Sequence, residues 1–339
     1  MAGPFHLYGL CTAGAALLAL GLMQCTRKKH GLSNEAVSWF AVLCVPLAVL
    51  FARLGYFLVR LNYFIEKGLL TFFRFDQGGY ILYGTVLGVF LAALLTARIT
   101  RTPLRSILDG AAGPGMLAVV CCRMAESLVR LGYGMSIVEW FGDPILLEFD
   151  PTARTPSSFP WADPSPLFTF PIACTPKGSD WYFSVFFLEA LAALAIALIV
   201  LLMKRRQAGG HATLAILLYA GCQILLESMR EDAVLTWGFV KVSQLFSAIT
   251  IAAVLLICCI RFPRGRRKPL KVAAAWVLFL LLLGVVIAME FALDEKIAFL
   301  SWMHMDLCYL VIGAAALGII FTVWPLWRKA FPRAAAAKA

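Results

Sequence analysis

Nine long apolar runs, separated by shorter polar segments, limit what this chain can fold into. The runs lie at about residues 8–25, 36–59, 78–97, 107–129, 182–203, 212–229, 243–260, 270–291 and 305–326. A helix needs on the order of 20 apolar residues to cross a bilayer core about 30 Å thick. Because 61% of the residues are hydrophobic and only 14% are charged, the composition also lies outside the range of soluble domains. We therefore predict an all-α, polytopic integral membrane protein with about nine transmembrane helices.

Lysine and arginine gather in alternate connections between the runs. The basic segments are residues 27–29, 98–105, 204–206, 261–271 and the tail at 328–338. The positive-inside rule places all five segments in the cytoplasm, which puts the N-terminus outside and the C-terminus in the cytoplasm. This distribution accounts for the net charge of +11, so no nucleic-acid partner is predicted.

Cysteine usage and the first apolar run complete the classification. Most of the ten cysteines lie inside apolar runs, where they behave as small hydrophobic residues, so no disulfide framework is expected. No CxxC or His–Cys spacing typical of a metal site occurs, and neither a metal nor a cofactor is predicted. The first run has no basic segment before it and no small-residue cleavage site, which favours a retained span over a removed signal peptide.

The apolar run 107–129 ends in charged residues that need an explanation. At helical spacing Arg123, Glu126 and Arg130 fall within a sector of roughly 60°. Charges inside a bilayer normally face a helix bundle or a water-filled cavity, because facing lipid costs several kcal/mol. We therefore expect this helix to form one wall of a polar site.

The run 212–229 carries a second polar stripe. Tyr219, Gln223, Glu227 and Arg230 fall within a sector of about 80°. Both runs cross from inside to outside, so their polar ends lie at a similar depth in the outer half of the bilayer. We expect the two stripes to face one cavity.

Two interpretations of these stripes remain open. Arginine forks match phosphate bidentately, so an anionic lipid headgroup is one natural ligand. The alternative is a purely structural network, in which Arg123 pairs with Glu126 and Arg230 pairs with Glu227 at i, i+3 spacing.

Other polar residues lie in or near the apolar runs. Arg53 either extends to the outer interface or turns inward, and the sequence leaves both open. Glu189 lies about two turns into the run 182–203, and Asp109 lies near the cytoplasmic end of its run, ahead of Gly113, Pro114 and Gly115, which predict a kink. The segment 60–76, rich in aromatic and basic residues, is predicted to lie on the outer membrane surface.

The order and spacing of several short motifs resemble the bacterial prolipoprotein diacylglyceryl transferases over roughly residues 5–260. The motifs are Tyr8–Gly9, residues 52–56, Gly78–Gly79 with Gly84 and Gly88, Asp109 ahead of Arg123, residues 123–134 ending in Gly134, and the series from Tyr219 to Arg230. The chain differs where the family has His, Asn and Arg, since it carries Tyr83, Glu126 and Gln223 at those positions.

This resemblance implies an enzyme of the bacterial cytoplasmic membrane that transfers diacylglyceryl from phosphatidylglycerol, or a related phospholipid, to the cysteine thiol of a lipobox-bearing preprolipoprotein. By the resemblance, Arg123, Tyr83 and Glu126 are candidate catalytic residues. The candidate substrate-binding residues are Tyr8, Arg53, Asp109, Arg130, Gly134, Glu189, Tyr219, Gln223, Glu227 and Arg230. The alternatives are a phospholipid-binding protein on the same scaffold without the chemistry and, with less support, a transporter.

The same resemblance suggests a division of the chain. Residues 1–260 would form a seven-helix transferase-like core, with a proline-rich extracytoplasmic loop at 131–181. Residues 261–339, whose apolar runs carry few polar residues, would form a two-helix C-terminal extension.

The topology can be tested directly. Single cysteines introduced at residues 204–206 should react with a membrane-permeant thiol reagent and resist an impermeant one in intact cells, because the positive-inside rule places them in the cytoplasm. A cysteine introduced between 131 and 181 should react with both. Labelling of 204–206 by the impermeant reagent would overturn this topology.

Overall fold

A computed structural model describes residues 4–75, 78–136, 173–174, 182–232, 235–237, 240–262, 269–294, 296, 298–300 and 302–333. Within these residues nine helices are long and apolar enough to cross a membrane, which confirms the predicted all-α membrane class. They are α1 (Pro4–Thr26), α2 (Asn34–Val59), α4 (Leu82–Thr100), α5 (Leu104–Glu126), α8 (Val185–Leu202), α9 (Gly210–Ser228), α10 (Val242–Arg261), α11 (Pro269–Leu293) and α12 (Met305–Ala330).

Short elements connect the long helices. They are α3 (Leu61–Lys67), the 3₁₀ helices η1 (Arg27–His30), η2 (Leu69–Phe73), η4 (Ser127–Val129) and η6 (Ala298–Leu300), and the strands β1 (Ala173–Cys174), β2 (Tyr182–Phe183), β3 (Thr236–Trp237) and β4 (Val240–Lys241). The strands form two antiparallel pairs, β1 with β2 and β3 with β4.

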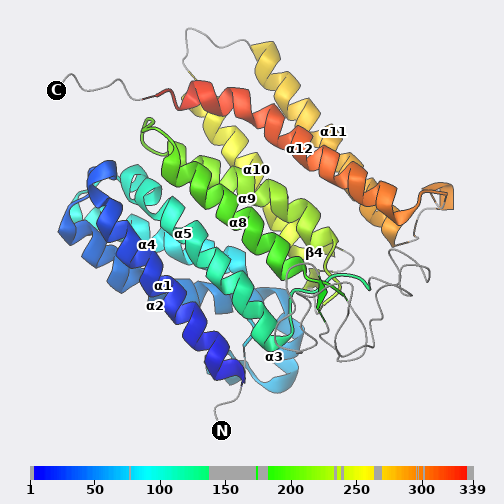
Figure 1. Cartoon of the computed structure of the whole chain (residues 1–339), viewed down its shortest axis with the longest axis horizontal. Helices are drawn as coiled ribbons and strands as arrows, with labels where there is room; N and C mark the ends of the chain where they lie inside the picture. Colours follow the sequence, from blue (N-terminus) through cyan, green and yellow to red (C-terminus); the bar gives the residue numbers. More distant parts are fainter. Residues whose placement is uncertain are drawn as a thin grey trace, which may run out of the picture.

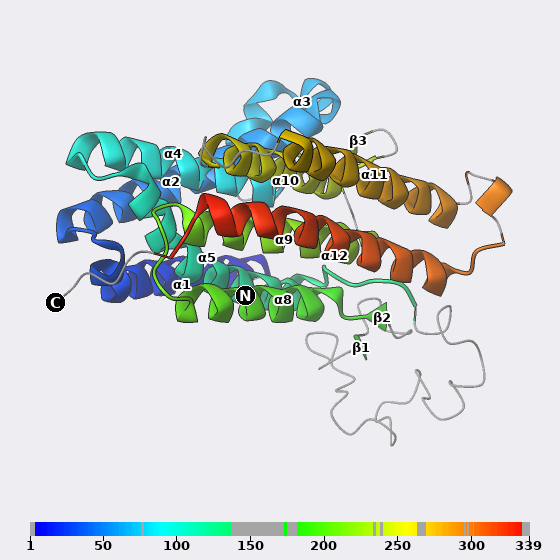
Figure 2. The ribbon, with the colours of Figure 1, turned by 90° about the horizontal axis from the view of Figure 1, so that it is seen from above.

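The long helices lie side by side, with α1, α2, α4 and α5 at one side of the bundle and α11 and α12 at the other (Figure 1). Viewed from above, α9 and α12 lie between a group containing α1, α5 and α8 and a group containing α4, α10 and α11 (Figure 2). α9 is the most buried of the nine helices within the described residues. α1 begins and α12 ends at opposite ends of the bundle (Figure 1), as an odd number of spans requires, while the sidedness itself stays a prediction.

The last two helices share a core with the helices before them. One hydrophobic cluster joins Leu217 of α9, Leu255 of α10, Phe279 of α11 and Ile312 of α12. Trp327 of α12 is fully buried, and its Nε1 donates to the Gly210 carbonyl oxygen of α9 at 3.2 Å. The division of the chain at residue 260 stays a prediction, but the extension packs tightly against α9 and α10.

Arg53 turns inward, which settles the choice that the sequence left open. Its side chain is 2% exposed and donates to backbone carbonyl oxygens of η2 and of the segment that joins η2 to α4. The acceptors are Phe72 at 3.1 Å, Thr71 at 2.9 Å, Arg74 at 3.1 Å, Gly79 at 3.3 Å and Gly78. One guanidinium therefore holds residues 71–74 and 78–79, part of which belong to the segment predicted to lie on the membrane surface. α3 and η2 project from one face of the bundle (Figure 2).

α2 and α4 pack closely because α4 presents glycines to α2. A Cβ atom at Gly88 would lie 2.3 Å from the Leu47 carbonyl oxygen and 2.7 Å from Ala48 Cα, and Gly84 meets the α2 backbone in the same way. Small residues four apart allow two helix backbones to approach each other in a membrane, where no water drives the helices together.

We expect Gly88→Ala to lower the thermal stability of the detergent-purified protein, because the added methyl group meets backbone that cannot move aside. Overpacking of this kind typically costs about 1–3 kcal/mol. Gly14→Ala is the matched control, since nothing lies within 4 Å of a Cβ at Gly14 of α1, and it should leave stability unchanged or raised. Equal melting temperatures for the two variants would contradict this packing.

Candidate functional site

Charged and polar side chains meet where α5, α8 and α9 approach the same end of the bundle. We call this group the buried charge cluster: Arg123, Glu126, Glu189, Tyr219, Gln223, Glu227, Arg230 and Asp232. The stripes of α5 and α9 thus face each other, as the sequence predicted, with Glu189 of α8 joining them.

Arg123 links α5 to both neighbouring helices. Its Nη1 donates to Glu126 Oε1 at 2.5 Å and lies 3.2 Å from Glu189 Oε2, and its Nη2 donates to the Tyr219 hydroxyl at 3.2 Å. The residue is only 9% exposed, so these partners replace the water that a guanidinium would otherwise bind.

Glu189 lies at the centre of the cluster and has no exposed surface. Besides Arg123, its carboxylate accepts a hydrogen bond from Gln223 Nε2 at 2.9 Å and one from Arg230 Nη1 at 3.3 Å. Gln223 also donates to Glu227 Oε2 at 2.9 Å, while Gln223 Oε1 has no partner in the described chain. A buried carboxylate between two arginines is stable only while both arginines remain.

Arg230 follows α9 and pairs with three carboxylates. Its guanidinium lies 3.4 Å from Glu126 Oε2, 3.3 Å from Glu189 Oε2 and 2.6 Å from Asp232 Oδ2. The structural alternative had predicted a pair with Glu227 at i, i+3, and that pairing is wrong. α9 ends at Ser228, so Arg230 leaves the helical face and turns toward α5 and α8.

Asp232 belongs to the cluster although the sequence analysis did not select it. Its Oδ2 accepts from the backbone N–H of Gly132 at 2.8 Å. Burial raises the pKa of Asp232, but the hydrogen bonds from Arg230 and Gly132 outweigh burial and hold the pKa below its usual range. The sequence could have indicated Asp232, because its carboxylate follows Arg230, the last residue of the polar stripe, by two residues.

Glycines allow the chain after α5 to pass close to the cluster. Gly132 has a φ of +77°, and a Cβ there would lie 2.5 Å from Glu126 Oε2. Gly134 donates its N–H to the Phe183 carbonyl oxygen at 2.8 Å and pairs in a short antiparallel bridge with Arg230. Gly134, a predicted site residue, thus lies beside the cluster and contacts its neighbours through its backbone.

Two tyrosines lie at the edge of the cluster. Tyr8 of α1 is partly buried and interacts electrostatically with Glu126, Arg123 and Arg230. The Tyr83 hydroxyl of α4 lies 2.5 Å from Ser247 Oγ of α10, and its ring stacks on Phe246. Tyr83 is also within electrostatic range of Tyr219, Glu227 and Arg123, so α1, α4 and α10 close the site around the three central helices.

Three of the predicted site residues lie neither in the cluster nor at its edge. Asp109 lies at the opposite end of α5, where its oxygens accept from the backbone N–H groups of Gly209 and Ala212. Arg53 holds residues 71–74 and 78–79, as described above. Arg130 is exposed because α5 ends at Glu126 and the 3₁₀ turn η4 follows, so the common face predicted for positions 123, 126 and 130 is not formed.

The fold and site define a multi-pass membrane protein with a desolvated, arginine-containing site near one end of the bundle. A family model described as prolipoprotein diacylglyceryl transferase matches residues 2–260, and the chain belongs to this family.

Curated relatives carry the name phosphatidylglycerol–prolipoprotein diacylglyceryl transferase. One from Halalkalibacterium halodurans is 23% identical over 78% of this chain and 85% of its own length. One from Limosilactobacillus reuteri is 26% identical over 76% of this chain and 88% of its own. A third, from Synechococcus elongatus, is 24% identical over 74% of this chain and 82% of its own. These relatives are transferases, and none of the comparisons favours the non-catalytic alternative.

We expect Glu189→Leu to lower the free energy of unfolding by about 3–5 kcal/mol, because it leaves two buried arginines short of a counter-charge. Denaturant titration in detergent, followed by tryptophan fluorescence, would measure the loss. Asp294→Ala removes one partner of an exposed pair, Asp294–Lys296 at 2.6 Å, and should cost less than about 1 kcal/mol. Similar losses for the two variants would show that the cluster is not the tight network described here.

Proposed function

We propose that this chain is an enzyme of the bacterial cytoplasmic membrane that transfers diacylglyceryl from phosphatidylglycerol to the cysteine thiol of a lipobox-bearing preprolipoprotein. One observation carries the proposal: Arg123 of α5 and Arg230 after α9 converge on Glu126 and Glu189 inside the bundle. Family membership and the names of the relatives support the reaction class.

The two arginines suit a phosphate that becomes a leaving group. Guanidinium forks match phosphate oxygens bidentately, and their hydrogen bonds strengthen where water is excluded. Negative charge develops on the phosphate oxygen as its bond to the glycerol carbon breaks, so fixed cations at that oxygen lower the barrier.

The carboxylates of the cluster outnumber its arginines, so an entering phosphate must take an arginine from a carboxylate. Glu126 is the carboxylate best placed to yield. Its side chain is 12% exposed against none for Glu189, and its Oε2 makes no hydrogen bond, although Arg230 lies 3.4 Å away. Glu189 would then keep both arginines in position while Glu126 is displaced.

The bond changes of the proposed transfer balance without a cofactor. The thiol loses its proton, the thiolate sulfur forms a bond to the diacylglycerol carbon, and the carbon–oxygen bond to phosphate breaks. Glycerol phosphate leaves with the electron pair of that bond. The proton requires an acceptor, and the Glu126 carboxylate, which Arg123 Nη1 contacts, is the candidate. The neutral Tyr83 hydroxyl, which lies beside Ser247, would take part only by passing a proton on.

The test is transfer by the purified protein in vesicles of phosphatidylglycerol, with a lipobox peptide as acceptor and mass spectrometry of the peptide as the readout. We expect a mass increase of one diacylglyceryl group per cysteine, and no transfer in vesicles of phosphatidylethanolamine alone. Arg123→Ala should abolish transfer, because the phosphate loses its main counter-charge and Glu189 loses a partner. Arg123→Lys should restore only part of it, since lysine cannot form the fork.

Two further variants sharpen the result. Tyr83→Phe should reduce transfer while leaving phosphatidylglycerol binding nearly intact, because only the hydroxyl is removed. Lys296→Ala, which changes an exposed side chain outside the cluster, should transfer like the unmodified protein. If the protein binds phosphatidylglycerol but transfers no more than Arg123→Ala, the enzyme proposal is wrong and lipid binding is its activity.

A further inference from the structure

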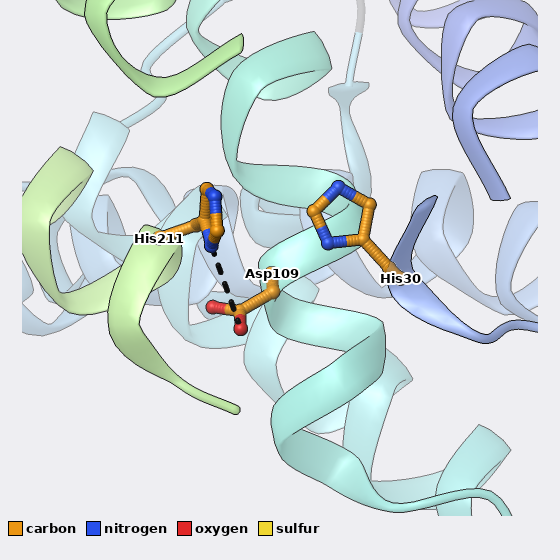
Figure 3. Close-up of side chains that lie close together, drawn as sticks. All are labelled: His30, Asp109 and His211. Atoms are coloured by element: carbon orange, nitrogen blue, oxygen red, sulfur yellow. Dashed lines mark ion pairs between the residues drawn. The ribbon is translucent and has the colours of Figure 1, made fainter. Parts of the chain in front are cut away.

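The end of the bundle away from the buried charge cluster brings together three side chains that are far apart in the sequence. His30 ends η1, Asp109 lies in α5 and His211 lies in the first turn of α9. The two imidazoles flank the carboxylate (Figure 3). One ligand atom from each residue lies within 4.8 Å of the ligand atoms of the other two.

His211 is the unusual member of this group. Its side chain is 1% exposed, yet neither ring nitrogen completes a hydrogen bond of normal geometry with the described residues. The backbone of Met203 interacts with the ring, and Asp109 and His30 are the polar side chains beside it. Leaving buried polar atoms unpaired costs about 1–3 kcal/mol for each group, so these nitrogens call for a further partner.

The neighbours of His211 are arranged as ligands rather than as hydrogen-bond partners. His211 Nδ1 is 3.9 Å from Asp109 Oδ2, which is too long for a hydrogen bond (Figure 3). The His30 ring meets the His211 ring edge to face, with centroids 5.3 Å apart, so the two rings do not hydrogen-bond either.

Asp109 is fixed in position but is not saturated. Oδ2 accepts from the Gly209 N–H at 2.8 Å and Oδ1 from the Ala212 N–H at 2.9 Å. A carboxylate offers about four lone-pair sites, so two remain for another partner. The backbone of α9 therefore holds the carboxylate oxygens beside His211.

We propose that His30, Asp109 and His211 bind a divalent transition-metal ion, with zinc as the reference ion. Two imidazoles and one carboxylate form a known zinc ligand set, and a fourth position is then open to water. Ligands about 2.1 Å from a tetrahedral zinc lie about 3.4 Å apart, so His211 and Asp109 need to approach by roughly 0.5 Å. The three residues line one pocket together with Ser106, Arg205, Arg206 and Ala208.

Two of the nearby cations are held by other partners, while Arg205 also lines the pocket. Lys29 Nζ donates to the Leu201 carbonyl oxygen at 2.6 Å. Arg206 donates to the Phe331 carbonyl oxygen at 2.8 Å, and its guanidinium lies over the Trp327 ring. Their positive charge weakens a cation site through space and favours an anion such as phosphate, which makes phosphate the competing occupant for the test. Neutral imidazole nitrogens and carboxylate oxygens carry lone pairs, so these three side chains favour a metal cation over an anion.

A metal at this position would join η1, α5 and α9 at the predicted cytoplasmic end of the bundle. It is independent of the proposed transferase reaction, whose cluster lies at the other end of α5. Sequence spacing gave no sign of it, because each ligand comes from a different segment.

The test is metal binding by the full chain, purified without a polyhistidine tag and stripped with a chelator. Calorimetry with zinc and visible spectroscopy with cobalt should show one ion per chain, and the cobalt spectrum should lack the intense band of thiolate ligands. His30→Ala and His211→Ala should each weaken zinc binding by at least about tenfold, since each removes one of three protein ligands. Zinc should raise the melting temperature of the unmodified protein but not that of either variant.

His304→Ala is the matched control, because His304 is exposed and lies just before α12, outside this group. It should bind zinc like the unmodified protein. The proposal is overturned if the unmodified protein binds no zinc at one ion per chain, or if both histidine variants bind it equally well. It is overturned as well if inorganic phosphate, and not zinc, binds and protects the protein from heat. Measuring transfer activity in parallel separates failure of this site from failure of the proposed function.

Discussion

The carboxylate of Glu189 is buried without exposed surface between Arg123 and Arg230, and the arrangement of this end of the bundle depends on it. Each charge would be costly alone in a low-dielectric interior, so none of the three can be removed without leaving another unpaired. Because the three residues come from α5, α8 and the segment after α9, their pairing also fixes where these helices end relative to one another.

In the proposed reaction the same pairing prepares the site for an anion. Arginines that are already positioned and shielded from water need little rearrangement when a negative charge forms beside them. Stability and chemistry therefore make opposite demands on the carboxylates. In that proposal Glu189 stays with the arginines and holds the helices, whereas the partly exposed Glu126 gives them up.

The sequence was sufficient for the parts of the structure that follow from periodicity and hydrophobicity. Run length predicted the nine helices, and helical spacing predicted that the stripes of α5 and α9 face each other. It failed where a helix ends early. A prediction from periodicity assumes that the helix continues. Arg130 was therefore placed on the same face as Arg123, although α5 ends at Glu126. Arg230 was likewise paired with Glu227, although α9 ends at Ser228.

Contacts made through backbone groups were also beyond the sequence. Arg53 and Asp109 were expected to bind substrate, but their partners are backbone carbonyl and N–H groups of distant segments. Every residue carries such groups, so no side-chain pattern marks the partner. The predicted function came from the resemblance to a known family. Composition and spacing alone did not distinguish an enzyme from a lipid-binding protein or a transporter.

Two carboxylates tie α5 and α9 together from opposite ends. Asp109 of α5 holds the first N–H groups of α9, and Asp232 beyond α9 holds the N–H of Gly132 beyond α5. A slide of one helical turn, about 5.4 Å, along the shared axis would break both ties at once. These two helices are therefore held in a fixed register, and an opening beside the cluster would come from sideways movement of the helices around them.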